Sequence, residues 1–184
     1  MDRRPVSLGA HNDVKIRHAH LQDLEALAQL KYELDLYHKN MPIWPPECDM
    51  REARRTMKTL LKDRRHAIFV AESSNKEIVG IVTTRVLRRK TLHPEYRRVG
   101  EIGILHVQEA SRRQGVGKCL VEACIDHFDK RGVKHVTLRS VVYNDISDRF
   151  WRSLSLNPAL YVRSSTVDNV RNRLKAMAGI PHNA

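Results

Sequence analysis

A short glycine-containing loop, RRQGVGK at residues 112–118, separates an apolar segment near the middle of the chain from an amphipathic one. The segment before it, residues 102–107, is apolar and rich in residues that favour extended backbone, which predicts a strand. The segment after it repeats apolar residues at helical spacing, which predicts a helix that begins near Gly115. The first N–H groups of such a helix lack intrahelical partners, and its dipole is positive at that end. Because Gly115 and Gly117 have no side chains to block approach, the loop is predicted to hold an anion such as a phosphate.

Two well-defined phosphate motifs do not fit this loop. A nucleoside-triphosphate loop needs a glycine five residues before the Gly-Lys pair and a Ser or Thr after it. Those positions hold Arg112 and Cys119. A dinucleotide fingerprint needs a third small residue where this chain has Leu120. A different phosphate-bearing ligand is therefore expected.

Hydrophobic periodicity along the rest of the chain predicts a mixture of helices and strands. In chain order we expect a strand at 14–17, helices at 21–37 and 50–65, strands at 67–72, 78–84 and 102–107, the helix after the loop, a strand at 136–141, a helix at 144–154 and a strand at 159–162. From residue 166 the chain is predicted to be a polar tail with one helical turn or more. The length suits a single α/β core.

These features together resemble the GNAT superfamily of N-acetyltransferases. The RxxGxG pattern at residues 112–117 is similar to that family's coenzyme A loop, and the order of predicted elements resembles its fold. The resemblance implies an α/β fold with a mixed central sheet flanked by helices. It also implies a GNAT domain at residues 13–165, with an N-terminal tail at 1–12 and a polar C-terminal tail at 166–184. The implied activity is direct transfer of an acetyl group from acetyl-CoA to a primary amine.

Acetyl-CoA is the implied co-substrate, and no metal is implied. The backbone of Leu105, His106 and Val107, before the loop, would pair with the pantetheine arm like an added strand. Arg112 would order the loop, and basic side chains after it would add charge near the phosphates. The N–H groups expected to carry the pyrophosphate belong to Arg113, Gln114, Gly115, Val116, Gly117 and Lys118.

A second stretch resembles another GNAT signature, in which an Asn opens a helix that carries an apolar-aromatic pair. Asn144 would hydrogen-bond the cofactor arm, and it also suits a helix N-cap. Trp151, which the resemblance also implies as a cofactor-binding residue, stands where the family usually has the tyrosine that protonates the leaving thiolate. An indole N–H cannot act as an acid near neutral pH, so that role does not carry over. Water or Tyr143 could deliver the proton instead.

Glu101 is the predicted general base. It lies eleven residues before Arg112, where histone-type GNAT enzymes place a glutamate. An amine acceptor arrives as an ammonium ion and must lose a proton before it attacks a thioester. The alternative is a surface carboxylate at the start of a strand that neutralises Arg97 or Arg98.

The acceptor is predicted only as a class, a small-molecule amine or a peptide N-terminus. In this fold the acceptor usually enters beside the connection between the first two helices. That region holds aromatic, proline and acidic residues: Tyr37, His38, Pro42, Trp44, Pro45, Pro46, Glu33, Asp35, Glu47 and Asp49. Ribosomal-protein alanine acetyltransferases have a glutamate a few residues before the Asn, whereas Arg139 lies five before Asn144, which argues against that subfamily.

The formal net charge of +12 is concentrated in two basic runs, residues 51–65 and 85–98. They suit a solvated face, attraction of coenzyme A, or contact with a polyanion. Only 5% of residues are aromatic, which gives little support to sequence-specific nucleic-acid binding. The alternative function is a catalytically weak GNAT-like module that binds acyl-CoA or docks on a polyanion. The sequence does not predict the oligomeric state, and it is compatible with a dimer.

Hydropathy predicts a cytoplasmic protein. No apolar run reaches membrane-spanning length, and no apolar signal core follows the N-terminal residues 1–4. The three cysteines have no metal-ligand spacing, and Cys119 and Cys124 are expected to be packed thiols in the helix after the loop.

Overall fold

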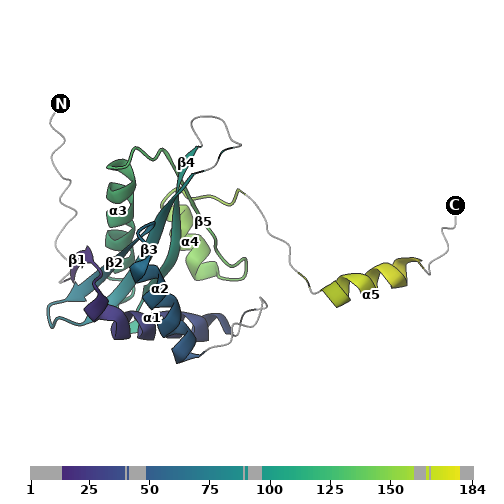
Figure 1. Ribbon diagram of the computed structural model, residues 1–184, viewed down its shortest axis with the longest axis horizontal. Helices are drawn as coiled ribbons and strands as arrows, with labels where there is room; N and C mark the ends of the chain where they lie inside the picture. The colour runs from purple at the N-terminus through teal and green to yellow at the C-terminus, as the bar shows by residue number, and fades with distance from the viewer. Residues whose placement is uncertain are drawn as a thin grey trace. The chain divides into compact units, whose positions relative to one another are not determined.

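The computed structural model describes residues 14–39, 41, 49–88, 90, 97–159, 165 and 167–178. The described residues fall into two compact units, which divide between Asp148 and Arg149. As far as α4, the elements have the order that the sequence predicts (Figure 1). They are β1 Val14–His18, the 3₁₀ turn η1 Leu21–Asp23, α1 Leu24–Lys39, α2 Met50–Lys62, β2 His66–Ser73, β3 Ile78–Arg88, β4 Arg98–Val107, the 3₁₀ turn η3 Glu109–Ser111, α3 Val116–Asp129, β5 His135–Leu138, α4 Asp145–Ser153 and α5 Val167–Ala178.

The first unit is built on a five-stranded sheet with the strand order β1-β2-β3-β4-β5. The first four strands pair antiparallel. Short connections join β2 to β3 and β3 to β4, whereas α1 and α2 lie between β1 and β2. β5 pairs parallel with β4, and α3 provides the crossover between them. The predicted mixed sheet flanked by helices is confirmed.

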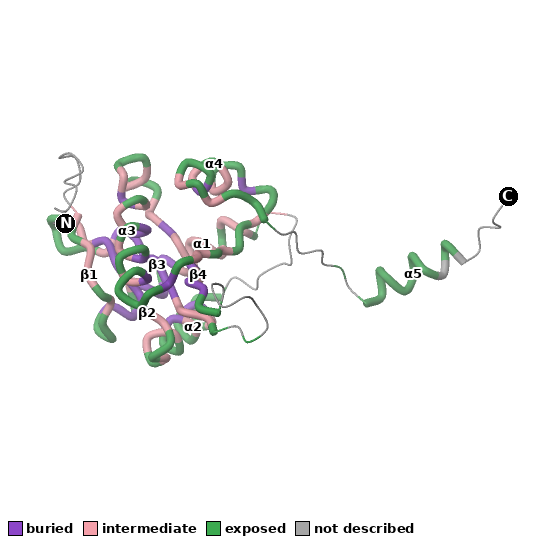
Figure 2. Tube along the Cα trace, turned by 90° about the horizontal axis from the view of Figure 1, so that it is seen from above, coloured by how far each residue is buried: buried purple, intermediate pink, exposed green. Residues whose placement is uncertain are grey.

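Helices cover both faces of this sheet. α1 and α2 pack on one face around a cluster of buried apolar residues: Leu24, Leu27, Leu30, Met57, Ile68, Val70 and Ile81. α3 packs on the other face, where a methyl group on Gly80 would meet Leu120 and one on Gly100 would meet Phe128. Burial therefore concentrates in the strands and on the inward sides of the helices (Figure 2). α3 leads from the glycine-containing loop, so its packing fixes the loop at one end of the sheet.

β4 contains a bulge that redirects its second half. The register with β3 shifts between Ile102 and Leu105, so that two residues of β4 lie opposite Thr83 alone. These residues are Gly103 and Ile104, and the N–H of Ile104 donates to Thr83 Oγ1 at 2.9 Å. A methyl group on Gly103 would lie 2.6 Å from the same oxygen, which is too close without a shift. Because a bulge bends and twists its strand, β4 diverges from β5 beyond this point.

Several predicted bounds differ from the structure. β5 ends at Leu138, short of the predicted residue 141, because its partner β4 turns away after Ile102. The predicted polar tail contains the helix α5, whose described side chains are exposed. The predicted last strand at 159–162 lies, apart from Ala159, outside the described residues. Among the described residues no helix is long and apolar enough to cross a membrane.

We expect Gly100→Ala to destabilise the protein by about 1–3 kcal/mol, the usual cost of overpacking a core. A methyl group there would lie 2.7 Å from the ring of Phe128, which is fully buried. Chemical denaturation followed by circular dichroism measures the change. Combining Gly100→Ala with Phe128→Leu should cost less than the sum of the two single changes, because the smaller side chain makes room for the methyl group. An unchanged denaturation midpoint for Gly100→Ala would contradict the packing of α3 on β4.

Candidate functional site

The loop that precedes α3 has unusual backbone geometry at two positions. Gly115 is the N-cap of α3 with φ 83°, and Arg113 has φ 64°. The first hydrogen bonds of the helix return to the Gly115 carbonyl from the N–H groups of Lys118 (2.9 Å) and Cys119 (3.1 Å). The N–H groups of the two preceding helical positions, Val116 and Gly117, thus lack intrahelical acceptors. The start of α3 therefore has the donor arrangement that suits a phosphate.

Arg112 connects this loop to β4 and α1. Its Nε donates to the Val107 carbonyl oxygen at 3.0 Å, and its Cζ lies 5.9 Å from the centre of the Tyr37 ring. The second distance is within cation–π range. The side chain thus anchors the loop to the end of β4, which is the arrangement expected of a residue that orders the loop. The side chains of Arg113 and Lys118 are exposed.

Among the described residues, the second half of β4 has an edge without a partner strand. β5 pairs with β4 only from Val99 to Ile102, whereas β3 pairs with it as far as Val107. In the part of the chain that the structure describes, no strand takes the place of β5 beside Leu105, His106 and Val107. An unpaired edge can take up an extended ligand through main-chain hydrogen bonds. This edge ends at the loop, so the two predicted parts of the cofactor site are adjacent.

Asn144 lies at the start of α4 and has two donors on its side-chain oxygen. The N–H of Ser147 donates to Asn144 Oδ1 at 3.0 Å, which is the contact of an N-cap. The Tyr37 hydroxyl donates to the same oxygen at 3.4 Å, and Asn144 is buried. Tyr37 therefore contacts both the loop residue Arg112 and the predicted cofactor residue Asn144. The helical spacing of the sequence did not indicate these two contacts.

Glu101 is ion-paired within the sheet. Its Oε1 accepts from Arg85 Nε at 3.0 Å and from Arg85 Nη2 at 2.7 Å. The two residues are direct cross-strand neighbours, and the Glu101 side chain is 17% exposed. The partner is thus Arg85 of β3, whereas the alternative interpretation of the sequence named Arg97 or Arg98. Glu101 points to the α1–α2 face, because the adjacent Gly100 faces α3.

A second ionisable pair lies on the same face and was not anticipated from the sequence. His106 Nε2 lies 3.2 Å from Glu33 Oε2 of α1, and the His106 side chain is 6% exposed. Burial lowers the pKa of His106 below its usual value, although Glu33 acts in the opposite direction. A neutral ring that donates Nε2–H to Glu33 presents Nδ1 as a proton acceptor. The sequence signal for this pair was His106 itself, a polar residue within an apolar strand.

Trp151 belongs to the second unit and is buried, with its ring 4.9 Å from that of Phe150 in an edge-on arrangement.

Cys124 is fully buried in α3, and burial raises the pKa of its thiol to about 12. A thiol in that environment stays protonated, so Cys124 is a packed residue and not a nucleophile.

The region predicted to admit the acceptor is described in part. Pro42, Trp44, Pro45, Pro46 and Glu47 lie outside the described residues. Between α1 and α2 the surface holds a cavity of about 830 Å³ with both acidic and basic lining residues. Asp35 in this lining pairs with Lys31, and Glu52 pairs with Arg55. The described acidic groups here are largely neutralised, and a cationic acceptor would have to displace these partners.

Comparisons with known proteins identify the fold and the family. Residues 33–155 match the acetyltransferase (GNAT) family. The structure is similar to a transcriptional regulator from Bacillus halodurans C-125, with TM-score 0.67 and 23% identity over 83% of this chain and 99% of that one. It is also similar to an aminoglycoside N-acetyltransferase in complex with CoA, with TM-score 0.68 and 19% identity over 88% and 97% of the two chains. An aminoglycoside acetyltransferase from an uncultured soil metagenomic sample gives TM-score 0.62 and 25% identity over 84% and 97%. No curated protein sequence matches significantly.

The family match covers most of the first unit, including α3 with its loop, and the beginning of the second. It extends over the bulged strand β4, its unpaired edge and Asn144, the parts that the sequence pattern had singled out. The chain belongs to the GNAT family of acetyltransferases.

Proposed function

We propose that this protein transfers the acetyl group of acetyl-CoA to a primary amine. The observation that carries the proposal is the continuity of the unpaired β4 edge with the donor-rich start of α3. In the proposed complex the pantetheine arm extends along Leu105–Val107, and the pyrophosphate accepts hydrogen bonds from the loop. The domain bounds of 13–165 stay a prediction.

The proposed reaction is direct. The neutral amine attacks the thioester carbonyl carbon, a C–N bond forms, the C–S bond breaks, and coenzyme A leaves as a thiolate. The acceptor ammonium loses one proton to a base before the attack, and its nitrogen loses a second proton as the amide forms. The thiolate takes one proton from water or a hydroxyl, so one proton is released to solvent overall. A thiol pKa of about 8.5 makes the thiolate a tolerable leaving group without an acid at Trp151. The Tyr37 hydroxyl contacts Asn144, whereas Tyr143 is exposed, so Tyr37 is the better-placed hydroxyl in the first unit.

Glu101 remains the proposed general base, and His106 is a second candidate. The carboxylate of Glu101 accepts two hydrogen bonds from Arg85, which hold its side chain in one orientation. His106 lies on the same α1–α2 face of the sheet as Glu101. Its segment of β4 is the one assigned to the pantetheine arm. Variants of the two residues separate these candidates.

We expect Trp151→Phe to retain most activity and Trp151→Ala to lower the melting temperature. Trp151 is buried, so removing its ring takes away packing, whereas phenylalanine preserves an aromatic side chain. Thiol release and thermal unfolding measure the two effects. Trp151→Tyr is the matched control for an acid at this position. A gain of about tenfold in turnover for that variant, worth about 1.4 kcal/mol of barrier, would contradict a purely packing role.

The test of the function is thiol release from acetyl-CoA with a panel of amines: amino acids, polyamines, aminoglycosides and peptide N-termini. Aminoglycosides belong in the panel because two similar structures are aminoglycoside acetyltransferases. Acceptor-dependent release with acetylated product in the mass spectrum is the expected result. The second candidate, a catalytically weak acyl-CoA-binding module, is favoured by Trp151 in place of the usual tyrosine. Tight acetyl-CoA binding without release for any amine would favour that module.

A further inference from the structure

A cavity of about 410 Å³ opens at the end of the sheet where β2 and β4 begin. Apolar side chains of α2 and the strands line part of it, together with three histidines and five arginines. The arginines are Arg64, Arg65, Arg88, Arg98 and Arg131. No carboxylate side chain is among the lining residues in the part of the chain that the structure describes. The cavity is referred to below as the arginine cavity.

Among the described residues, carboxylates neutralise little of this positive charge. Arg65 pairs with Asp63. Among the described residues, no carboxylate pairs with Arg64, Arg88 or Arg98, although ion pairs are common elsewhere on the sheet and helices. Arginines gathered at one concavity repel one another and raise the local potential. An anion would relieve that repulsion.

The strand register brings two of these arginines directly opposite each other. Arg88 at the end of β3 and Arg98 at the start of β4 are cross-strand partners. Like charges in this arrangement destabilise a sheet. Arg98 also extends toward the end of α3, where its Nη1 lies 4.0 Å from the position that a methyl group on Gly132 would take. The neighbouring Arg131 lines the same cavity, so three cations from separate elements converge.

Two of the three histidines, His18 and His127, lie near the positive charge of Arg131. Burial lowers the pKa of His127 to about 4, and the charge of Arg131 adds to this effect. Burial, with Arg131 again contributing, also lowers the pKa of His18. Both rings are therefore neutral at pH 7, and a neutral imidazole can still donate one N–H to an anion.

The arginine cavity is separate from the predicted acetyl-CoA site. Arg98 and the loop lie toward opposite ends of β4, a strand that spans about 30 Å at 3.3 Å per residue. α3 begins at the loop and ends near the cavity, which is lined by His127 in its last turn and by Arg131 just beyond its end. An anion in the cavity would thus occupy a second site and not the pyrophosphate position.

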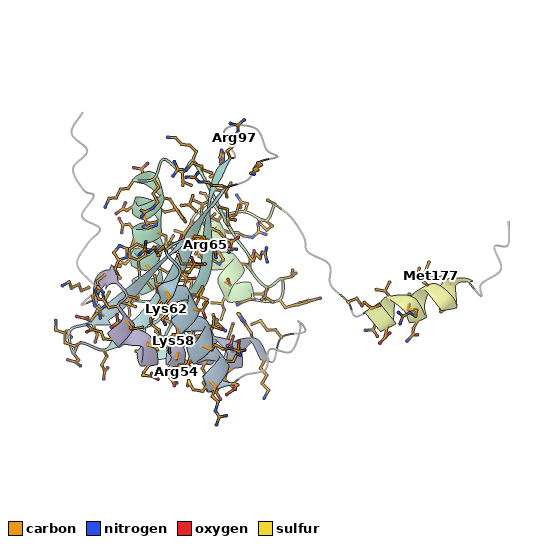
Figure 3. The ribbon with its side chains drawn as sticks, in the orientation of Figure 1. Arg54, Lys58, Lys62, Arg65, Arg97 and Met177 are labelled. Carbon is orange, nitrogen blue, oxygen red and sulfur yellow. The ribbon has the colours of Figure 1, made fainter. Side chains whose placement is uncertain are left out.

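We infer that the arginine cavity binds a small molecule that carries two or more phosphate groups. Guanidinium groups match phosphate oxygens with paired hydrogen bonds, and several arginines suit more than one phosphate. The volume falls in the range of small-molecule sites, and the described lining residues include no Trp or Tyr that could stack on bases. Other basic side chains follow α2 outside the cavity, among them Lys58 and Lys62 (Figure 3).

Titration calorimetry with inorganic tripolyphosphate, at a constant ionic strength of about 0.15 M, tests the proposal. The background is Gly117→Glu, which is expected to close the loop to phosphate. We expect one bound tripolyphosphate, and at least tenfold weaker binding after Arg88→Gln and Arg98→Gln are added. The matched control is Lys58→Gln with Lys62→Gln, which removes the same charge from exposed positions outside the cavity and should leave the affinity unchanged. In the chain without the Gly117 change, the two arginine changes should likewise remove one bound tripolyphosphate.

Melting temperatures provide a second test of the same inference. Because Arg88 and Arg98 repel each other, Arg88→Gln should raise the melting temperature of the ligand-free protein, and tripolyphosphate should raise that of the unchanged protein more than that of the variant. Absence of tripolyphosphate binding would overturn the inference. So would an equal loss in the lysine control, which indicates general charge attraction. Tighter binding of a single-stranded RNA of about 20 nucleotides that depends on Lys58 and Lys62 would indicate a nucleic-acid surface instead, and would also overturn it.

Discussion

Replacing Gly117 with Glu should abolish acetyl-CoA binding in a titration at physiological ionic strength. Gly117 is the second helical position of α3, and its N–H lacks an intrahelical acceptor. A glutamate side chain there would bring a negative charge to the place assigned to the pyrophosphate. Like charges forced together cost several kcal/mol, so we expect affinity to fall by about 10²-fold or more.

Gly117→Ala is the matched control, because a methyl group adds little bulk and no charge and suits a helix. It should retain binding within a few-fold. Glutamate is favourable in the first turn of a helix, so Gly117→Glu should keep the melting temperature of the parent protein. Equal acetyl-CoA affinity for the glutamate variant and the parent would show that the loop is not the cofactor site. Parent binding should also weaken with added salt, since charge attraction is screened over about 8–10 Å at these ionic strengths.

Glu101→Gln should lower turnover with a high-pKa amine by roughly 10²–10⁴-fold, the usual worth of general-base catalysis. Glutamine keeps the shape of the side chain but removes its basicity, so acetyl-CoA affinity should be unchanged. Raising the pH should partly rescue the variant, because a larger share of the amine is then already deprotonated. Steady-state thiol release from pH 7 to 9.5, measured on both proteins, provides the comparison.

Arg85→Gln separates a catalytic Glu101 from a structural one. Both changes remove the ion pair of Glu101 with Arg85, but only Glu101→Gln removes the carboxylate. A catalytic Glu101 predicts a large loss of turnover for Glu101→Gln and a small one for Arg85→Gln, with similar melting temperatures. Equal turnover of Glu101→Gln and the parent at neutral pH would assign the glutamate a structural role. A 10²-fold or larger fall in His106→Gln, partly rescued at high pH, would then make His106 with Glu33 the base.

The sequence alone was sufficient to find the loop, the helix that follows it and the mixed α/β fold. These depend on local signals: two glycines at fixed spacing, apolar residues at helical or alternating spacing, and the breaks between them. Such signals come from residues close in sequence, which directly determine the local backbone conformation. The backbone roles predicted for residues 105–107 and 113–118 come from the resemblance to the GNAT family and stay predictions.

The contacts around the site were decided by the tertiary structure. Glu101 and Arg85 are 16 residues apart, Glu33 and His106 are 73 apart, and Tyr37 and Asn144 are 107 apart. Each pair meets because of strand register or helix packing, which no periodicity encodes. The bulge opposite Thr83 ends the pairing with β5, and the register that places Arg88 opposite Arg98 concentrates charge at the other end of the sheet. Sequence spacing indicated where the glycine-containing loop lies, whereas packing of distant segments determined which ionisable side chains lie on the α1–α2 face of β4 and where arginines converge.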